Sequence, residues 1–438
     1  MLLRNKRHIN QKLFITMIIT AMAFILRDGF NRNVPLYFFL AHYALSFIFM
    51  SRDDITSLFL FLIPLSVGPL LYYLNVVYGL IFFIKNRRRL PLSNVVIISF
   101  VLFLWEAAHV LINILAGYDD SIIKLLGFGL CLLVLAFNPM TETVADSYTK
   151  MLYSWCFGFA SLCGILLLKY MNQFGIGGFP EIVRRFGFVR MVDTTSTSLL
   201  INPNQLGRQV IITVFCLLTV VHFDKQEKKR AFSLIAFFVP FGLMSGSRAF
   251  LLVGFIVGAL YLVDNLARLK ANWRQILLVL VMATLIAFFV NHFMGATVGM
   301  VSRRLASQDV SGGRIEIYGD YLSRLLDSAS LIVGRGMQDY NDKYGVAHST
   351  HNLILEIVVM WGIIGLLIVG LWSASLHAGL ELATPVFRKT IIPYLPLLGL
   401  FLNVQFGQFF ISYYHTFPTL MLALFNIKYA DSKLIRIG

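Results

Sequence analysis

The chain has 438 residues, of which 58% are hydrophobic and 13% are charged, and its mean hydropathy is +0.75. Soluble domains carry roughly 45–50% apolar and about 25% charged residues, so this composition excludes a soluble globular protein. The formal net charge is +15. Its basic residues stand in short clusters between apolar runs, which is typical of membrane topology signals and argues against nucleic-acid binding.

Apolar runs of about 17–25 residues recur along the chain and predict about twelve (12–14) membrane-spanning helices. A transmembrane barrel would show ~10-residue alternating strands instead. We therefore expect an all-α polytopic transmembrane helix bundle that forms one integral membrane domain, residues 1–438. The predicted spans are 11–27, 34–50, 92–117, 121–137, 151–171, 207–223, 231–244, 249–267, 274–295, 352–374, 390–412 and 415–429.

Two parts of this topology depend on single features of the sequence. The stretch 55–84 contains Pro64 and Pro69 and predicts either a broken hairpin or one tilted span with a surface segment. The basic N-terminal segment predicts a retained first span, because no small-residue cleavage site precedes Arg27 and Asp28. The four cysteines lie inside apolar runs without a CxxC pair, and we interpret them as packing residues.

The basic clusters define the orientation of the predicted bundle. They can all face the cytoplasm if 55–84 returns to its starting side, and both termini are then inside. The loops 172–206 and 295–351, with the turn Ser245–Ser247, then lie on the extracytoplasmic face. The clusters are Arg4/Lys6/Arg7, Lys85/Arg87/Arg88/Arg89, Lys225/Lys228/Lys229/Arg230, Arg268/Lys270/Arg274, Arg388/Lys389 and Lys433/Arg436.

Arginines are frequent in the loops predicted to face outward, although the positive-inside rule predicts few basic residues there. Arginine suits phosphate because its planar fork donates two parallel hydrogen bonds and stays charged. For the cluster as a whole we therefore expect an anion site on this face, whereas for any single arginine we favour pairing with loop carboxylates or lipid headgroups. These arginines are Arg184, Arg185, Arg190, Arg208, Arg303, Arg304, Arg314, Arg324 and Arg335, with Arg248 at a helix start.

Two of these arginines follow glycine turns. Ser245-Gly-Ser-Arg248 separates two apolar runs, and Ser311-Gly-Gly-Arg314 precedes a predicted helix through Leu325. Small residues let the backbone turn closely, and the positive end of a helix attracts phosphate. Each motif alone is weak, whereas two on one membrane face favour an anion site.

A histidine pair lies where the large loop enters an apolar run, in His348-Ser-Thr-His351-Asn352-Leu-Ile-Leu-Glu356. A histidine there can accept a proton near neutral pH. We expect Asn352 or Glu356 to orient the ring, with Glu356 paired to an arginine as the alternative. A metal site is not expected, because the two histidines lack a clear third ligand.

Motifs of other enzyme classes are missing from the sequence. There is no P-loop, GxSxG or HExxH, which argues against a nucleotide-driven pump, a serine hydrolase and a zinc protease. The acidic pairs Asp53-Asp54 and Asp119-Asp120 flank predicted spans, and we interpret them as interfacial charges.

The order of the motifs resembles that of the O-antigen polymerase and O-antigen ligase superfamily of bacterial envelope enzymes. The resemblance covers about half of the chain. It rests on Asn202-Pro-Asn204-Gln-Leu-Gly207-Arg208, Ser245-Gly-Ser-Arg248, Gly312-Gly-Arg314, His351-Asn352 and Trp361-Gly-Ile-Ile-Gly365.

This resemblance implies a metal-independent, GT-C-like glycosyltransferase of the bacterial inner membrane with its active site on the periplasmic side. The large loop 295–351 would carry the catalytic histidine. His351 would deprotonate an acceptor hydroxyl, with His348 as the alternative base or a sugar ligand. Arg248 and Arg314 would bind the diphosphate of the donor. Arg208 is a less certain third arginine, and Asn204, Asn352 and Glu356 complete the substrate-binding set.

The resemblance also implies the partners and the reaction. Donor and acceptor would be undecaprenyl-diphosphate-linked oligosaccharides in the bilayer, no cofactor would be needed, and a chain-length-regulating copolymerase is an implied partner. The leading hypothesis is an O-antigen or other polysaccharide polymerase. The alternative enzyme is a ligase that passes the glycan to lipid A-core. A flippase is the alternative of another class, although flippases place charges inside their spans and these spans are nearly free of them.

Overall fold

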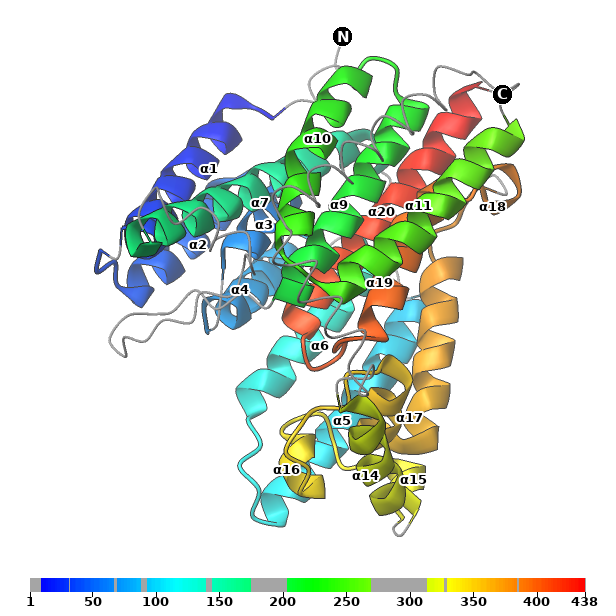
Figure 1. Ribbon diagram of the computed structural model, residues 1–438. Coiled ribbons are helices and arrows are strands. Elements are labelled where there is room, and N and C mark those ends of the chain that lie inside the picture. Colours follow the sequence, from blue (N-terminus) through cyan, green and yellow to red (C-terminus); the bar gives the residue numbers. More distant parts are fainter. Residues whose placement is uncertain are drawn as a thin grey trace.

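The computed structural model describes residues 9–30, 32–66, 69–87, 93–138, 144–174, 203–268, 313–326, 329–383 and 386–437. All regular elements within these ranges are helices. The start of α1 (Gln11–Phe24) and the end of α20 (Tyr413–Ile437) lie at the same end of the bundle, at the top of Figure 1. This part of the chain therefore has the all-helical architecture that the apolar runs predict.

Four described helices are long and apolar enough to cross a membrane, which identifies the chain as a membrane protein. They are α5 (Asn94–Leu115), α7 (Val144–Phe174), α9 (Pro203–Phe223) and α17 (Leu353–Ala378). Shorter apolar helices follow other predicted spans, and the count of twelve stays a prediction. The predicted span 274–295 lies outside the described residues.

The shorter helices complete the bundle. Their bounds are α2 (Leu36–Phe49), α3 (Arg52–Leu65), α4 (Pro69–Asn86), α6 (Ile122–Phe137), α10 (Lys228–Met244), α11 (Arg248–Arg268), α14 (Arg314–Leu326), α15 (Ser330–Val333), α16 (Tyr340–Tyr344), α18 (Val386–Lys389) and α19 (Leu395–Val404). A π-helical turn, Ile25–Gly29, extends α1, and a 3-10 turn, Ile392–Tyr394, precedes α19. Because α3 and α4 are two helices packed on one another, 55–84 has the form of a broken hairpin.

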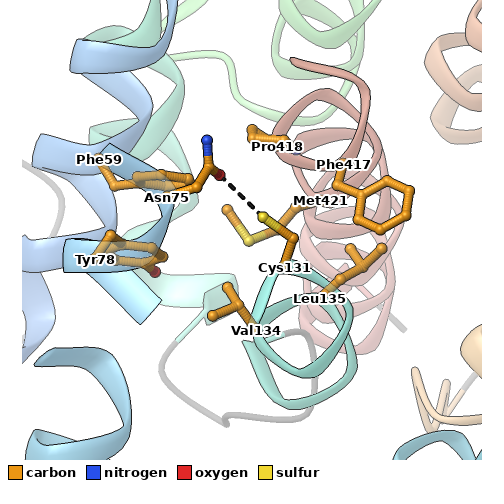
Figure 2. Close-up of a pocket in the computed structure, with 9 residues that line it drawn as sticks. All are labelled: Phe59, Asn75, Tyr78, Cys131, Val134, Leu135, Phe417, Pro418 and Met421. Atoms are coloured by element: carbon orange, nitrogen blue, oxygen red, sulfur yellow. Dashed lines mark hydrogen bonds between the residues drawn. The ribbon is translucent and has the colours of Figure 1, made fainter. Parts of the chain in front are cut away.

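The core of the bundle is tightly packed. A Cβ at Gly158 of α7 would lie 2.0 Å from the Phe61 carbonyl oxygen of α3, so only glycine permits this approach. Figure 2 shows a core pocket of about 10 Å³ where α4, α6 and α20 meet, with Cys131 donating a hydrogen bond to Asn75 Oδ1 at 3.3 Å. That volume is about one water molecule. All four cysteines are free and buried, in line with a packing role.

Two acidic side chains that the sequence suggests as interfacial charges are buried in ion pairs. Asp54 accepts from Lys150 Nζ at 2.7 Å, and Asp120 accepts from Lys343 Nζ at 2.9 Å. Both pairs are at most 5% exposed. A buried charge without a partner is strongly unfavourable, so each pair fixes two distant segments together.

The segment 329–350 packs against α5 and α17 at the end of the bundle opposite the start of α1, where α14, α15 and α16 gather in Figure 1. The fully buried Glu106 of α5 accepts hydrogen bonds from Trp361 Nε1 at 2.6 Å and from the Met337 amide at 3.1 Å. His109 contacts the carbonyl of Val333 at 2.8 Å. These contacts bring the residues before His351 onto the bundle.

A glycine kink in α17 makes room for the backbone of the segment 329–350. Gly362 has φ +67°, and a Cβ there would lie 2.1 Å from the Ile332 carbonyl oxygen. Beside it, the amide of Gly336 donates to the Met360 carbonyl at 2.7 Å. The Trp361-Gly362 motif therefore has a structural reason: the tryptophan bonds to Glu106, and the glycine leaves room for backbone.

Candidate functional site

Side chains from three helices and from one helix cap meet at residues 405–412, between α19 and α20; we name this segment the connector. Asn352 donates to Gln405 Oε1 at 3.4 Å, and Arg314 donates to the Phe406 carbonyl at 3.3 Å. Arg208 donates to the Gln408 carbonyl at 3.1 Å. Glu356 accepts from the amides of Phe409 at 2.8 Å and Ile411 at 3.0 Å.

The predicted span 390–412 is therefore wrong at its C-terminal end. The helix ends at Val404, and the connector is non-helical. Irregular backbone at membrane depth needs partners for its polar groups. The four side chains that meet here supply hydrogen-bond partners for several backbone groups of the connector. The cluster therefore allows the chain to be non-helical after Val404.

Arg208 lies one turn into α9 and is 8% exposed. Within the described part of the chain, its guanidinium donates one hydrogen bond, to Gln408, although five N–H donors are present. The charge of Glu356 acts on it, but both carboxylate oxygens of Glu356 already accept backbone amides. A buried cation with unused donors is well suited to bind an anion.

Arg314 is the first residue of α14, which begins where the sequence predicts a helix. Its guanidinium stands 5.6 Å from the centroid of the Phe406 ring, whose carbonyl it also contacts. Since Arg208 and Arg314 bond to carbonyls only two residues apart, those carbonyls are separated by at most about 7 Å of chain. Two guanidinium groups are thereby held at one short segment.

His351 lies within electrostatic range of Arg314, on the turn that leads into α17. Its backbone has φ +50°, a strained conformation for a side chain other than glycine. Burial lowers the pKa of the His351 imidazole from its usual 6.5, and the positive charges of Arg314 and His348 lower it further. A neutral imidazole is therefore favoured, which is the form that accepts a proton.

His348 occupies a different position from His351. Its side chain is exposed, and its carbonyl accepts a hydrogen bond from the Tyr321 hydroxyl at 2.8 Å. Tyr318, one turn earlier on α14, donates to the carbonyl of His351 at 3.5 Å. Helix α14 thus fixes the backbone at both histidines, while only the ring of His351 is half-buried.

Asn352 and Glu356 do not hydrogen-bond to the ring of His351. Asn352 caps α17, because its Oδ1 accepts the Leu355 amide at 3.0 Å. Glu356 is fully buried and faces the connector. Both residues belong to the cluster, but they shape its backbone rather than orient the ring.

The start of α11 lies against the start of α9. Ser247 Oγ donates to Asn204 Oδ1 at 2.8 Å and accepts the Phe250 amide at 3.2 Å, which caps the helix. A Cβ at Gly207 would lie 2.8 Å from Phe250 Cβ, so glycine allows the close contact. The first residue of α11, Arg248, is therefore placed beside the α9 turn that carries Arg208; the side chain of Arg248 lies outside the described residues.

Two other arginines of the loop predicted to face outward have structural roles. Arg324 donates to the Tyr344 carbonyl, and Arg335 donates to the Lys343 carbonyl and lies 4.5 Å from the centroid of the Tyr344 ring. Both hold the 340–345 turn. The arginines Arg184, Arg185, Arg190, Arg303 and Arg304 lie outside the described residues, as do most of the loops 172–206 and 295–351 up to residue 312.

Several residues that build or flank the site lie outside the motifs that predict it. Glu106 is a lone acid inside an apolar run, a signal that marks a buried role in membrane proteins. The polar Gln405 and Gln408 interrupt a predicted span and mark the connector. His415 on the first turn of α20 belongs to none of the motifs; its Nδ1 is buried and has no hydrogen-bond partner among the described residues.

An apolar cavity of about 640 Å³ adjoins the connector and follows α17, α19 and α20. Its lining begins at Leu353, Phe409 and Phe410, next to the cluster, and continues to Leu376 and Tyr394. Among the residues that the structure describes, no group of three histidine, cysteine or carboxylate side chains is arranged to hold a metal ion.

The site therefore combines a half-buried histidine, two arginines at one connector and an adjoining apolar cavity. Comparisons with protein-family models, with curated proteins and with solved structures find no match to this chain.

Proposed function

We propose that this protein is a membrane glycosyltransferase that moves a glycan from a polyprenyl diphosphate to an acceptor hydroxyl, and that it acts as a polysaccharide polymerase on undecaprenyl-diphosphate-linked repeat units. The observation that carries the proposal is the joint position of Arg208 and Arg314 on one connector, with His351, whose pKa is lowered, within electrostatic range of Arg314. The resemblance to O-antigen polymerases and ligases adds the class of donor and the periplasmic side of the inner membrane.

In the proposed reaction, an acceptor hydroxyl attacks the anomeric carbon of the donor glycan. Its proton passes to His351 as the new C–O bond forms. The bond between the anomeric carbon and the diphosphate oxygen breaks, and the electron pair leaves with the lipid diphosphate. Arg208 and Arg314, with Arg248, stabilise the charge that develops on this leaving group.

The apolar cavity supports a lipid-linked donor. It begins at Phe409, one residue after the carbonyl that Arg208 contacts, and its lining is almost entirely apolar. A diphosphate held at the connector would place its attached hydrocarbon at the mouth of this cavity. An almost entirely apolar lining can hold a polyprenyl chain without burying unpaired polar groups against it.

The test is glycan transfer by the purified protein in nanodiscs, given lipid-linked repeat units alone, with and without lipid A-core. A ladder of products from repeat units alone, absent in His351→Ala, is the result we expect. Transfer that requires lipid A-core would replace the polymerase with a ligase. Binding without transfer under either condition would favour a flippase and contradict the enzyme.

A further inference from the structure

The strongest unexplained feature near the proposed site is His415. It stands on the first turn of α20, directly after the connector. Its Nδ1 is buried and lacks a hydrogen-bond partner in the described residues, and its ring lies within electrostatic range of the Arg208 guanidinium. Buried polar atoms are nearly always paired, so an orphan beside a buried arginine points to a group that binds there.

The guanidinium of Arg208 also has hydrogen-bond donors that are not used. Within the described residues it donates one hydrogen bond, to the Gln408 carbonyl, and the carboxylate nearest to it is occupied by the connector amides. The Arg208 guanidinium at Gln408 and the ring of His415, three residues after the connector, are close enough to interact electrostatically. A ligand that satisfies both must offer several acceptor oxygens and negative charge.

The local contacts fix His415 in this position. Its backbone amide donates to the Ser412 carbonyl at 2.9 Å, and its carbonyl accepts from Thr419 Oγ1 at 2.6 Å. Thr416, the next residue, donates to the Phe409 carbonyl at 2.6 Å and ties the same turn to the connector. The imidazole is thus carried on a rigid element rather than on a loose loop.

We propose that His415 and Arg208 together form a phosphate subsite, in which an imidazole N–H donates to a non-bridging oxygen of the lipid diphosphate. This inference rests on the proposed function and adds a binding residue to it. His415 is assigned no proton transfer; His351 remains the base. The imidazole can donate from one ring nitrogen in its neutral form, so the contact does not require a charged histidine.

The experiment uses the full chain in nanodiscs and farnesyl diphosphate as the probe, with farnesyl monophosphate and farnesol for comparison. We expect His415→Ala to weaken farnesyl diphosphate binding about tenfold or more, because a hydrogen bond to a charged group is lost. His415→Asn should recover part of the affinity, because its amide nitrogen lies near the position of Nδ1. Farnesol binding should be unchanged in both variants.

His42→Ala is the matched control. His42 is a half-buried histidine of α2 that contacts Thr20 and stacks on Phe38, away from the connector. Its removal should leave diphosphate binding unchanged. In the wild-type protein, farnesyl diphosphate should also shift one imidazole ¹⁵N resonance that is absent from the His415→Asn spectrum, a readout that does not depend on how the alanine variant folds.

The outcomes separate this inference from the proposed function. If Arg208→Ala weakens farnesyl diphosphate binding while His415→Ala and the ¹⁵N spectrum show no effect, the subsite is wrong and the proposed function survives. If farnesyl diphosphate does not bind to the wild-type protein, both are overturned. An equal loss for farnesol and farnesyl diphosphate in His415→Ala would assign His415 to packing.

Discussion

Glu356 and Arg208 hold the same turn through opposite backbone groups. Glu356 accepts the amides of Phe409 and Ile411, whereas Arg208 donates to the carbonyl of Gln408, the residue directly before Phe409. The Glu356 carboxylate thereby organises the backbone, and the Arg208 guanidinium keeps N–H donors available for a ligand. This division explains how one acidic and one basic side chain can lie close together without neutralising the site.

The first prediction concerns the proposed base. His351→Ala should abolish glycan transfer and retain donor binding, because the arginines remain. His348→Ala should keep most of the activity, since His348 is exposed. Transfer rates and donor affinity for the two variants, measured on the same preparation, check the assignment. Loss in His348→Ala with activity in His351→Ala would reverse the two roles.

The second prediction is a pH dependence. The pKa of His351 is lowered below 6.5 by burial and by the charge of Arg314, so the neutral base persists into mildly acidic solution and the rate should fall only below pH 6.5. Arg314→Gln removes a positive charge, which raises this pKa and moves the acid limb of the rate profile to higher pH. Arg335→Gln is the control, because Arg335 is not among the charges acting on His351. An acid limb that stays in place in Arg314→Gln would contradict the coupling.

The third prediction separates charge from geometry at the arginines. Lysine at 208, 248 or 314 keeps the charge but loses the planar fork, so we expect partial activity and weaker donor use in each variant. Arg324→Lys is the control, because that side chain holds the Tyr344 carbonyl. Kinetics at varied donor concentration measure the effect. Full activity in all three lysine variants would show that charge alone suffices.

The fourth prediction tests the connector. Glu356→Gln leaves one acceptor oxygen for two amides, so the free energy of unfolding should fall by about 1–3 kcal/mol. Arg208 also loses its nearby negative charge. Thermal unfolding in nanodiscs, with the exposed Glu316→Gln of α14 as control, measures the difference. Equal stability of the two variants would mean that the connector does not need the carboxylate.

The fifth prediction concerns the kink of α17. Gly362→Ala should lower the unfolding temperature and weaken the packing of 329–350, because the added Cβ meets a backbone carbonyl at 2.1 Å in a residue with φ +67°. Gly370→Ala in the same helix is the control, since nothing lies within 4 Å of its added Cβ. Protease sensitivity of the 329–350 segment reports the loosening. If Gly370→Ala is the more harmful change, the kink is not required.

Much of the fold follows from local features of the sequence. The start of α17 is set by Asn352 as a capping residue before an apolar run, and the start of α14 by the glycine turn before Arg314. These signals act within one helical turn, so they can be read from neighbouring residues. The end of α19 at Val404 could not be read in this way, because long-range partners stabilise the connector.

The same distinction applies to the candidate site. The residue types and their order predict an anion site with a histidine, since arginine and histidine carry that chemistry wherever they stand. Which arginines remain available is a question of tertiary contacts. Arg324 and Arg335 are used on carbonyls of the 340–345 turn, whereas Arg208 is buried with unused donors, and His415 Nδ1 has no hydrogen-bond partner among the described residues.

The sequence by itself determined a helical membrane protein and its candidate chemistry, because hydrophobic run length and side-chain type are local properties. Only the tertiary structure decided that α9, α14, α17 and the 405–412 connector meet, and that Glu106 and Glu356 are buried partners of backbone and tryptophan N–H groups. Hydrogen bonds between residues 55 to 255 positions apart leave no pattern in a single sequence. Their reason is physical: buried polar groups in a membrane bundle are stabilised by hydrogen-bond partners, and the fold can supply these from any part of the chain.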